Sequence, residues 1–486
     1  MRNDKFSKGN ELVGVSGLKT TVQQKNGYDL LRIKPIRKLI EWNWFPYVFQ
    51  FLMLVVFITL IYIGWQVYTP ENVNAKLYAK TNIVTLVIWG IWWPLMVWFA
   101  VTLGRVWCMI CPLELVSNMT ERLSRKLGVG QNTLSKWIRG GSVIVFLYAL
   151  VQLLVAGINL HRIPAFTSFF LIALLTIAAV TGFLFKDRAF CRGFCPIGML
   201  LNAYGRGGML AVRAGSENTC KDCTGKDCIM SCNRNKLDSR SCPSLLNPPK
   251  LNSNKDCLVC GQCIKSCEPD NMQLLLRKPF DSRDAREVKA NWALTIFIIL
   301  VSGFVTSELT TEWKAANEIY VLIPEYFTKI TGLHSISGFL EGLWTIVIFP
   351  FSLWAILGLM AVITKNANSI TDAWRRLALP LVIIISAGHL TKAIAKLNTW
   401  AGFLPGSIDD PLGKNNLRSI AAGVNIPGEL FSNQIVSVIG LFLLSAAFIY
   451  SIREEKIINN NYFTRMIPKL IMYLLFSFIV IGIGFN

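Results

Sequence analysis

The sequence contains a run of four cysteines whose spacing suits an iron–sulfur cluster. The segment CLVCGQCIKSCEP supplies Cys257, Cys260, Cys263 and Cys267. Two residues separate each of the first three cysteines, and three residues precede the fourth. This is the bacterial ferredoxin spacing, in which three thiolates bind one cubane and the fourth reaches a neighbouring cluster. A zinc knuckle would use two separated pairs without the third close cysteine. The run therefore predicts iron–sulfur binding.

A looser cysteine run upstream predicts the partner cluster. The segments CKDCTGKDCIMSC and SRSCP contain Cys220, Cys223, Cys228, Cys232 and Cys242. In a two-cluster ferredoxin, the first three of these and Cys267 would hold one [4Fe-4S] cluster. The first three cysteines of the downstream run would hold the other, together with one upstream cysteine. Two cysteines could fill that last place: Cys232 has the expected spacing and is favoured, whereas Cys242 has the following proline.

Four further cysteines follow two apolar segments and could form a third redox or metal site. We call them the membrane-edge cysteines: Cys108, Cys111, Cys191 and Cys195. They lie in GRVWCMICPLELVSNM and DRAFCRGFCPIGMLLNAYG, which align at their Cys-Pro steps, each with an arginine, an aromatic residue and a cysteine upstream. This similarity predicts two related helical hairpins around a common axis.

On a continuing helix, residues three or four apart share a face, so the hairpins could turn all four membrane-edge cysteines inward. Four such thiolates could hold one metal or cluster, or form two redox pairs. The simpler alternative is that cysteine is here a small buried residue. The matching Cys-Pro positions favour a chemical role.

Nine apolar segments must position these cysteines, since each has roughly the twenty residues that a bilayer crossing needs. Their approximate ranges are 45–68, 83–105, 142–160, 166–186, 289–308, 343–363, 377–396, 434–451 and 466–485. Lysine and arginine are enriched in the leader and near 105–140, 364–376 and 452–469. By the positive-inside rule, the N-terminus and the cysteine-rich insert are cytoplasmic and the C-terminus lies outside.

The composition agrees with a membrane protein. Of the 486 residues 53% are hydrophobic, and the mean hydropathy is +0.45. The net charge is +20, and the basic residues border apolar runs, which indicates a membrane surface and no nucleic-acid partner. All thirteen cysteines lie between positions 108 and 267, a clustering that favours metal or cluster ligation in a reducing compartment over disulfides.

We therefore predict an all-α polytopic membrane protein of about nine transmembrane helices, with an inserted small α+β two-cluster ferredoxin-like domain. Four regions are expected. Residues 1–44 form a basic cytoplasmic leader without a signal-peptide pattern. Residues 45–212 form a four-helix membrane unit with the duplicated Cys-Pro motifs, and 213–288 form the cytoplasmic ferredoxin-like domain. Residues 289–486 form a membrane domain of about five helices with extracytoplasmic loops.

Histidines are scarce, and one of them suggests a second site. The three are His161, His334 and His389, and no CxxCH motif indicates covalent c-type haem. Only His389 lies in a predicted span, where it shares a helical face with Lys392 and Lys396. Ionisable groups at that depth are candidates for binding a quinone headgroup or an anionic partner group. Snorkelling lysines and a hydrogen-bonded core histidine are the simpler alternative, and we favour it.

The order of these motifs resembles that of the NapH/NosR-type membrane polyferredoxins over about residues 45–285. The resemblance rests on GRVWC and CP after one membrane hairpin, FCRGFCP after the next, and the ferredoxin module that follows. It implies two cytoplasmic [4Fe-4S] clusters and electron transfer between the quinone/quinol pool and redox partner proteins. Such partners include an extracytoplasmic reductase or a cytochrome, in an anaerobic respiratory chain of a bacterial or archaeal cytoplasmic membrane.

The chain departs from the family pattern in three ways. The first membrane motif is CxxCP, at Cys108 and Cys111, where the family has CxxxCP. The leader cannot form the flavin-binding domain of NosR-like members, and the C-terminal half exceeds a minimal NapH-like protein.

Three hypotheses follow, and the first is favoured. The protein is expected to be a membrane-integral iron–sulfur electron-transfer protein, either a quinol-linked oxidoreductase or an electron-transfer subunit. Alternatively, it is a metal-handling or assembly factor that binds and reduces copper or iron through the membrane-edge cysteines. A transporter with a ferredoxin module is disfavoured, because no clear inverted repeat and few charged residues lie within the spans.

Overall fold

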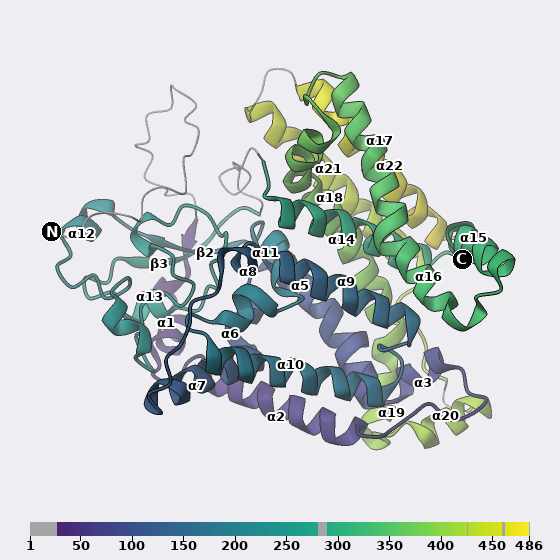
Figure 1. Ribbon diagram of the computed structural model, residues 1–486, viewed down its shortest axis with the longest axis horizontal. Helices are drawn as coiled ribbons and strands as arrows, with labels where there is room; N and C mark the ends of the chain where they lie inside the picture. Colours follow the sequence, from purple (N-terminus) through teal and green to yellow (C-terminus); the bar gives the residue numbers. More distant parts are fainter. Residues whose placement is uncertain (1–26, 280–288, 425, 459–461, 486) are drawn as a thin grey trace.

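The computed structural model describes residues 27–279, 289–424, 426–458 and 462–485. Residues 1–26 of the predicted leader and 280–288 of the predicted insert lie outside the described residues. The described chain is mostly helical, with one small sheet (Figure 1).

Among the described residues, eight helical stretches are long and apolar enough to cross a membrane. They are α2 (Tyr47–Gly64), the run from α4 (Ile83–Thr85) to α5 (Trp93–Thr102), α10 (Pro164–Leu184), α14 (Trp292–Thr310), the run from α16 (Ser337–Leu343) to α17 (Phe349–Ile363), α18 (Ile370–Trp400), α21 (Asn433–Ile458) and α22 (Tyr462–Ile483). The remaining predicted span corresponds to α9 (Ser142–Gly157), a shorter apolar helix. Its 16 residues extend about 24 Å, less than the roughly 30 Å of a bilayer core.

Helix α18 joins the two groups of membrane helices. It packs against α14, α17, α21 and α22 of the C-terminal region and against α5 of the N-terminal region. About 89% of the most apolar stretch of α18 is buried, so it is the central helix of the body. A helix surrounded in this way needs no polar face, which explains its long apolar sequence from Leu377 to Ile385.

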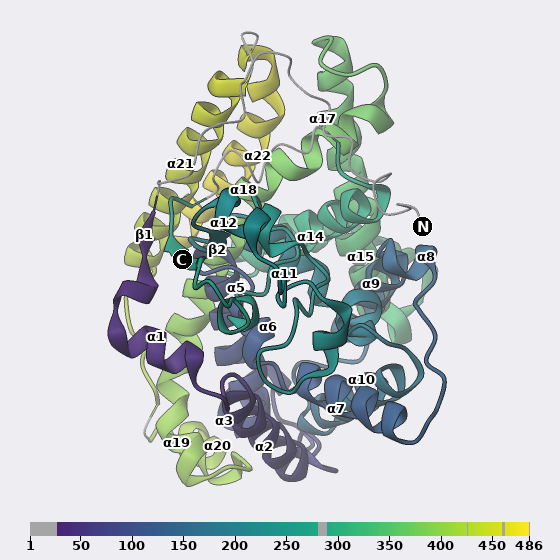
Figure 2. The same cartoon turned by 90° about the vertical axis from the view of Figure 1, so that its left-hand side faces the viewer.

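The cysteine-rich insert lies at one side of the helical body, opposite α15 (Lys314–Thr331) and α16 (Figure 1). Its sheet contains β1 (Tyr28–Asp29), β3 (Met272–Leu276) and β2 (Leu210–Ala214), in that order and antiparallel. One edge strand therefore comes from the leader, and α1 (Lys34–Glu41) follows it along the insert (Figure 2).

The core of the insert is shared with the leader. Leu31, Ile40 and Phe45 are buried together with Cys257 and other apolar residues of the insert. At Gly261, between two cysteines of the downstream run, the backbone has a φ of +71°, and a Cβ would lie 2.7 Å from Ile40 Cγ2. The sequence CGQC thus needs glycine both for its turn and for this close packing.

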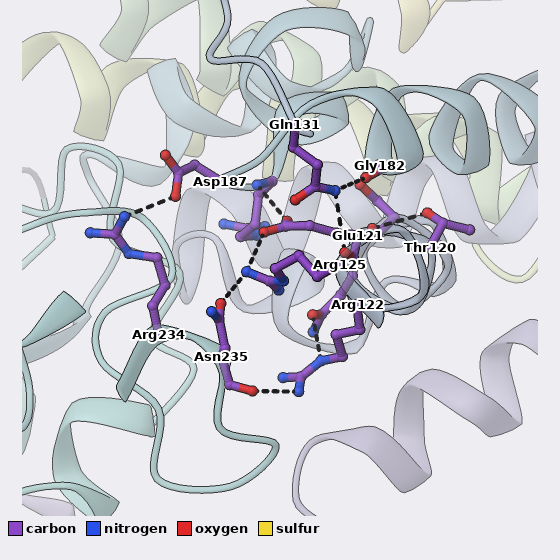
Figure 3. Close-up of polar contacts among 12 residues, drawn as sticks. Thr120, Glu121, Arg122, Arg125, Gln131, Gly182, Asp187, Arg234 and Asn235 are labelled. Atoms are coloured by element: carbon purple, nitrogen blue, oxygen red, sulfur yellow. Dashed lines mark hydrogen bonds and ion pairs between the residues drawn. The ribbon is translucent and has the colours of Figure 1, made fainter. Parts of the chain in front are cut away.

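Polar contacts hold the insert on helix α7 (Pro112–Lys126), which begins directly after the first Cys-Pro step (Figure 3). The Arg122 guanidinium donates to the carbonyl oxygens of Asn235 (2.7 Å) and Lys236 (2.8 Å). Arg125 donates to the Asn235 side chain, and Arg234 pairs with Asp187 at 3.1 Å. The loop between the two cysteine runs of the insert is thereby fixed to α7 and, through Asp187, to the segment that follows α10.

Candidate iron–sulfur site

The two Cys-Pro motifs have matching backbone geometry. Cys111 precedes Pro112 with φ −68° and ψ 127°, and Cys195 precedes Pro196 with φ −70° and ψ 113°. A residue before proline is driven out of the helical region, so each helical turn ends at its second cysteine. Each motif therefore places one cysteine within a short helix and the other at its end.

The two cysteines are three residues apart in the first motif and four apart in the second, and the two motifs form different types of helical turn. In the first motif, Cys108 lies within the α-helical turn α6 (Val106–Ile110), and Cys111 follows at its end. In the second, residues Phe190–Phe194 form a π-helical turn, and the Cys195 N–H donates to the carbonyl of Phe190, five residues back. The wider turn accommodates the extra residue. The CxxCP spacing is thus compatible with a shared site.

The membrane-edge cysteines come together in the structure. All four line one apolar cavity within the helical body. Burial raises the pKa of the Cys111 thiol well above its usual value, and the nearby Cys191, Cys108 and Cys195 thiols raise it further. Burial likewise raises the pKa of the Cys191 and Cys195 thiols, and binding to iron would favour the thiolate form.

Two arginines occupy equivalent places in the two repeats, three residues before Cys108 and Cys191. Arg105 and Arg188 are 7% and 5% exposed. Arg105 Nη2 lies 3.9 Å from Cys108 Sγ, and its Nη1 lies 3.6 Å from the carboxylate of Asp256 in the insert. This arginine therefore links the membrane-edge cysteines to the segment that carries the downstream cysteine run.

A buried carboxylate completes the charge network. Glu114 is 2% exposed and accepts hydrogen bonds from Gln50 (2.7 Å) and Arg240 (3.0 Å), while Arg188 Nε lies 3.2 Å away. Burial would raise the pKa of Glu114, but Arg240 and Arg188 together lower it below its usual value. The sequence predicts no role for the two repeat arginines, and no pattern marks Glu114 or Arg240, because their partners are distant in sequence.

Several buried guanidinium N–H groups have no hydrogen-bond partner within the described part of the chain. They are Arg105 Nε, Arg188 Nη2 and Arg240 Nε. Unpaired buried donors of this kind call for an acceptor. The Arg188 and Arg105 side chains lie near the membrane-edge cysteines, and Arg240 lies near Cys260. The sulfur atoms of an anionic cluster would supply that acceptor, so the residues present fit such a group.

Four cysteines form the outer group of the insert, Cys220, Cys223, Cys228 and Cys267, and they lie near one another in the structure. Burial raises the pKa of Cys228 to about 11, and the neighbouring Cys267 and Cys220 thiols raise it further, with Cys223 also close. Asn271 lies between two of these sulfurs, donating its backbone N–H to Cys267 Sγ (3.2 Å) and its side-chain amide to Cys220 Sγ (3.1 Å). Such donors lower the electron density on cluster ligands and so tune a cluster's potential.

In the structure Cys242, the alternative ligand, lies beside the inner group of the insert. Burial raises the pKa of Cys242 to about 12, and Cys260 and Cys257 raise it further. After burial, Cys242 is the largest cause of the raised pKa of Cys263. Cys232 is exposed and lies on a short 3-10 turn. The chain after Cys232 loops back and brings the Cys242-Pro243 step to the downstream run, so Cys242 is the ligand that we propose below.

No group of three or more His, Cys, Asp or Glu side chains among the described residues, which include all thirteen cysteines, converges closely enough to hold a single metal ion. A mononuclear tetrahedral site would require such convergence. A cubane instead binds each thiolate to a different iron, so its ligands are spread around it.

His389 and Lys392 are satisfied by protein partners. His389 is 2% exposed, and its Nδ1 is 3.1 Å from the Tyr204 hydroxyl. Lys392 Nζ lies 2.5 Å from Glu312 and 3.3 Å from Glu308. Neither side chain lines the cavity that contains the membrane-edge cysteines. Both side chains thus have protein partners, and their part in a quinone or partner site stays a prediction.

Comparison with known proteins gives the class of the chain. The family model described as a 4Fe-4S binding domain matches residues 85–130 and 167–213. Each range contains one Cys-Pro motif, so the two motifs are copies of one domain, and the insert's cysteine runs lie beyond both ranges. With its apolar helices, the chain is a multi-pass membrane protein that carries 4Fe-4S binding domains.

Individual relatives narrow this class. The ferredoxin-type proteins NapH of Haemophilus influenzae and Escherichia coli are 25% identical to the chain over 182 and 195 residues. These matches cover 36% and 37% of this chain and 63% and 64% of the relatives, just under two thirds of their length. The putative electron transport protein YccM of Escherichia coli is 25% identical over 221 residues, 40% of this chain and 58% of YccM. No solved structure matches. The resemblance to NapH-type membrane polyferredoxins is confirmed.

Proposed function

We propose that this protein transfers electrons through iron–sulfur clusters between the quinone/quinol pool and redox partner proteins, in an anaerobic respiratory chain. The observation that carries the proposal is the gathering of three cysteine groups. One lies at the membrane edge and two lie in the insert, with Arg105 in contact with both Cys108 and Asp256. The names of the relatives, ferredoxin-type protein and putative electron transport protein, agree with it.

We assign three clusters to these groups. The membrane-edge cysteines hold one, Cys220, Cys223, Cys228 and Cys267 hold the second, and Cys242, Cys257, Cys260 and Cys263 hold the third. When bound, each cluster would exchange single electrons. The chain's own residues orient the ligands, exclude water and set the charge around them. The insert is placed on the cytoplasmic side and the C-terminus outside, from the distribution of lysine and arginine.

The buried arginines have a defined part in this proposal. Arg105 and Arg188 place positive charge beside the membrane-edge cysteines, and Arg240 does so beside the inner group of the insert. Positive charge favours the reduced, more negative form of a cluster and so raises its potential. Glu114 holds two of these arginines at fixed positions between the two groups.

The test is anaerobic purification with iron and sulfide analysis and EPR, on the wild type and on a variant with all four membrane-edge cysteines changed to serine. Because each four-cysteine site holds one [4Fe-4S] cluster, the wild type should contain about twelve iron and the variant about eight. The EPR signals of the insert should be retained in the variant. Equal iron in both samples would refute the membrane-edge cluster. Zinc without sulfide in the wild type would refute the electron-transfer proposal as a whole.

A further inference from the structure

The cavity that contains the membrane-edge cysteines extends across the helical body. Besides those cysteines, its lining includes His161, Glu308 and Lys396. His161 lies just before α10, and Cys191 lies just after it. The 21 residues of α10 extend about 30 Å, so the lining reaches both ends of a membrane-length helix. The cysteines lie at one end and a histidine, a carboxylate and an ammonium group at the other.

The walls of the cavity are mainly apolar and aromatic. Trp89 and Trp92 line it, and their rings lie 6.3 Å from the His161 ring and 5.2 Å from the Trp107 ring, respectively. Trp107 is the residue before Cys108. Aromatic rings therefore extend from the polar end toward the cysteines, and such walls suit a flat ring with an apolar tail.

Two lining side chains carry a buried ring N–H. In the described ranges Trp92 Nε1 has no hydrogen-bond partner, whereas the His161 imidazole interacts with the backbone of Val155. The Arg162 Nε–H donates to His161 Nε2 at 3.1 Å, so a neutral His161 carries its proton on Nδ1. Burial and the neighbouring Arg162 lower the pKa of His161 to about 3, which keeps the ring neutral. The lining thus contains one N–H donor that lacks an acceptor, Trp92 Nε1, and a neutral imidazole, that of His161.

The polar end offers both a donor and an acceptor. The Lys396 ammonium lies 5.2 Å from the Trp400 ring centre, and the Glu308 carboxylate lies 3.3 Å from Lys392. An anionic lipid headgroup would be repelled by Glu308. A haem would need an axial nitrogen, but His161 Nε2 already accepts a hydrogen bond from Arg162. A neutral ring fits both side chains if its oxygens are carbonyls when oxidised and hydroxyls when reduced. The carbonyls would accept from Lys396, and the hydroxyls would donate to Glu308.

We propose that this cavity binds the ring of a quinone or quinol, with its oxygens bonded by His161, Lys396, Glu308 and Trp92 and its ring between the tryptophans. The assignment rests on the proposed function, which requires a lipid-soluble redox molecule. It places the site away from His389 and Lys392, and it connects the bound ring to the membrane-edge cysteines through one cavity.

Quinones quench tryptophan fluorescence on contact, which gives a test that needs no cluster. The full chain in nanodiscs of neutral lipid is titrated with decylubiquinone. The wild type should show saturable quenching. Glu308→Gln should weaken binding about tenfold, since a hydrogen bond to a charged group is lost. Glu312→Gln is the matched control, because Glu312 also pairs with Lys392 but does not line the cavity, and its affinity should stay within about twofold of the wild type.

Trp92→Phe provides a second variant that keeps the wall aromatic and removes only the unpaired donor. It should weaken binding several-fold without changing the melting temperature. The inference is overturned if quenching is not saturable, if Glu308→Gln and Trp92→Phe both bind like the wild type, or if Glu312→Gln loses as much affinity as Glu308→Gln. Absence of saturable binding in a preparation with its full iron content would refute this site and leave cluster-mediated electron transfer standing. Saturable binding by a protein that contains no sulfide would support this site and refute cluster-mediated electron transfer.

Discussion

Replacing Glu114 with glutamine should release the insert from the helical body. The substitution keeps the shape and the contact with Gln50, but it leaves the buried guanidinium groups of Arg188 and Arg240 without their counter-charge. Removing one partner of a buried ion pair costs about 3–5 kcal/mol. With a denaturant slope of about 4 kcal/mol per molar guanidinium, a loss of about 4 kcal/mol lowers the midpoint by about 1 M.

The assay is a guanidinium titration in detergent, with release of the insert followed by limited proteolysis and by cluster absorbance. Glu41→Gln is the control, because its pair with Arg37 is shorter (2.7 Å) but its side chain is 44% exposed, so the midpoint should not move measurably. The same reasoning gives a pH dependence. Since the pKa of Glu114 is lowered in the fold, its contribution is complete above the ordinary glutamate range and is lost as the pH falls through the folded pKa. An unchanged midpoint in Glu114→Gln, or an equal shift in Glu41→Gln, would refute this reasoning.

Three further outcomes are expected. Cys242→Ser should lose about four iron while Cys232→Ser keeps the wild-type content, measured by iron and sulfide analysis; the opposite result would restore the ligand favoured by spacing. Arg122→Ala removes two hydrogen bonds to backbone carbonyls of the insert and should make the loop around Asn235 several times more sensitive to protease, and unchanged digestion would contradict its docking role. His389→Phe leaves the buried Tyr204 hydroxyl unpaired and should cost about 1–3 kcal/mol of stability with unchanged decylubiquinone binding; weaker binding would return this histidine to the quinone site.

The membrane helices and the cysteine groups could be anticipated from sequence because both depend on local pattern. Each predicted apolar segment coincides with a helix, since a bilayer crossing requires a continuous run of apolar residues. The duplicated Cys-Pro motifs can be recognised from the amino-acid sequence, and one family model matches both. Proline then fixes the backbone of the preceding cysteine in both copies.

What could not be anticipated depends on chain segments that meet only in the folded protein. Cys232 has the better spacing, but the path of the intervening loop brings Cys242 to the inner group. Glu114 carries no motif, and its partners Arg188 and Arg240 are far away in sequence. The π turn that reconciles the unequal spacing of the two motifs is likewise a property of hydrogen bonding and not of residue type.

The pairing of β1 with β3 sets an order of assembly. Tyr28 lies opposite Leu276, so the leader strand must wait for roughly 250 further residues to be synthesised before its partner exists. At about 5–20 residues per second, this delay is on the order of 10–50 seconds, during which the first four apolar helices can enter the membrane. The core around Cys257 includes Leu31 and Ile40 and closes only after that interval. Delivery of iron and sulfide to the inner group of the insert is therefore expected to be a late event, open to assembly machinery until the N-terminal segment folds over it.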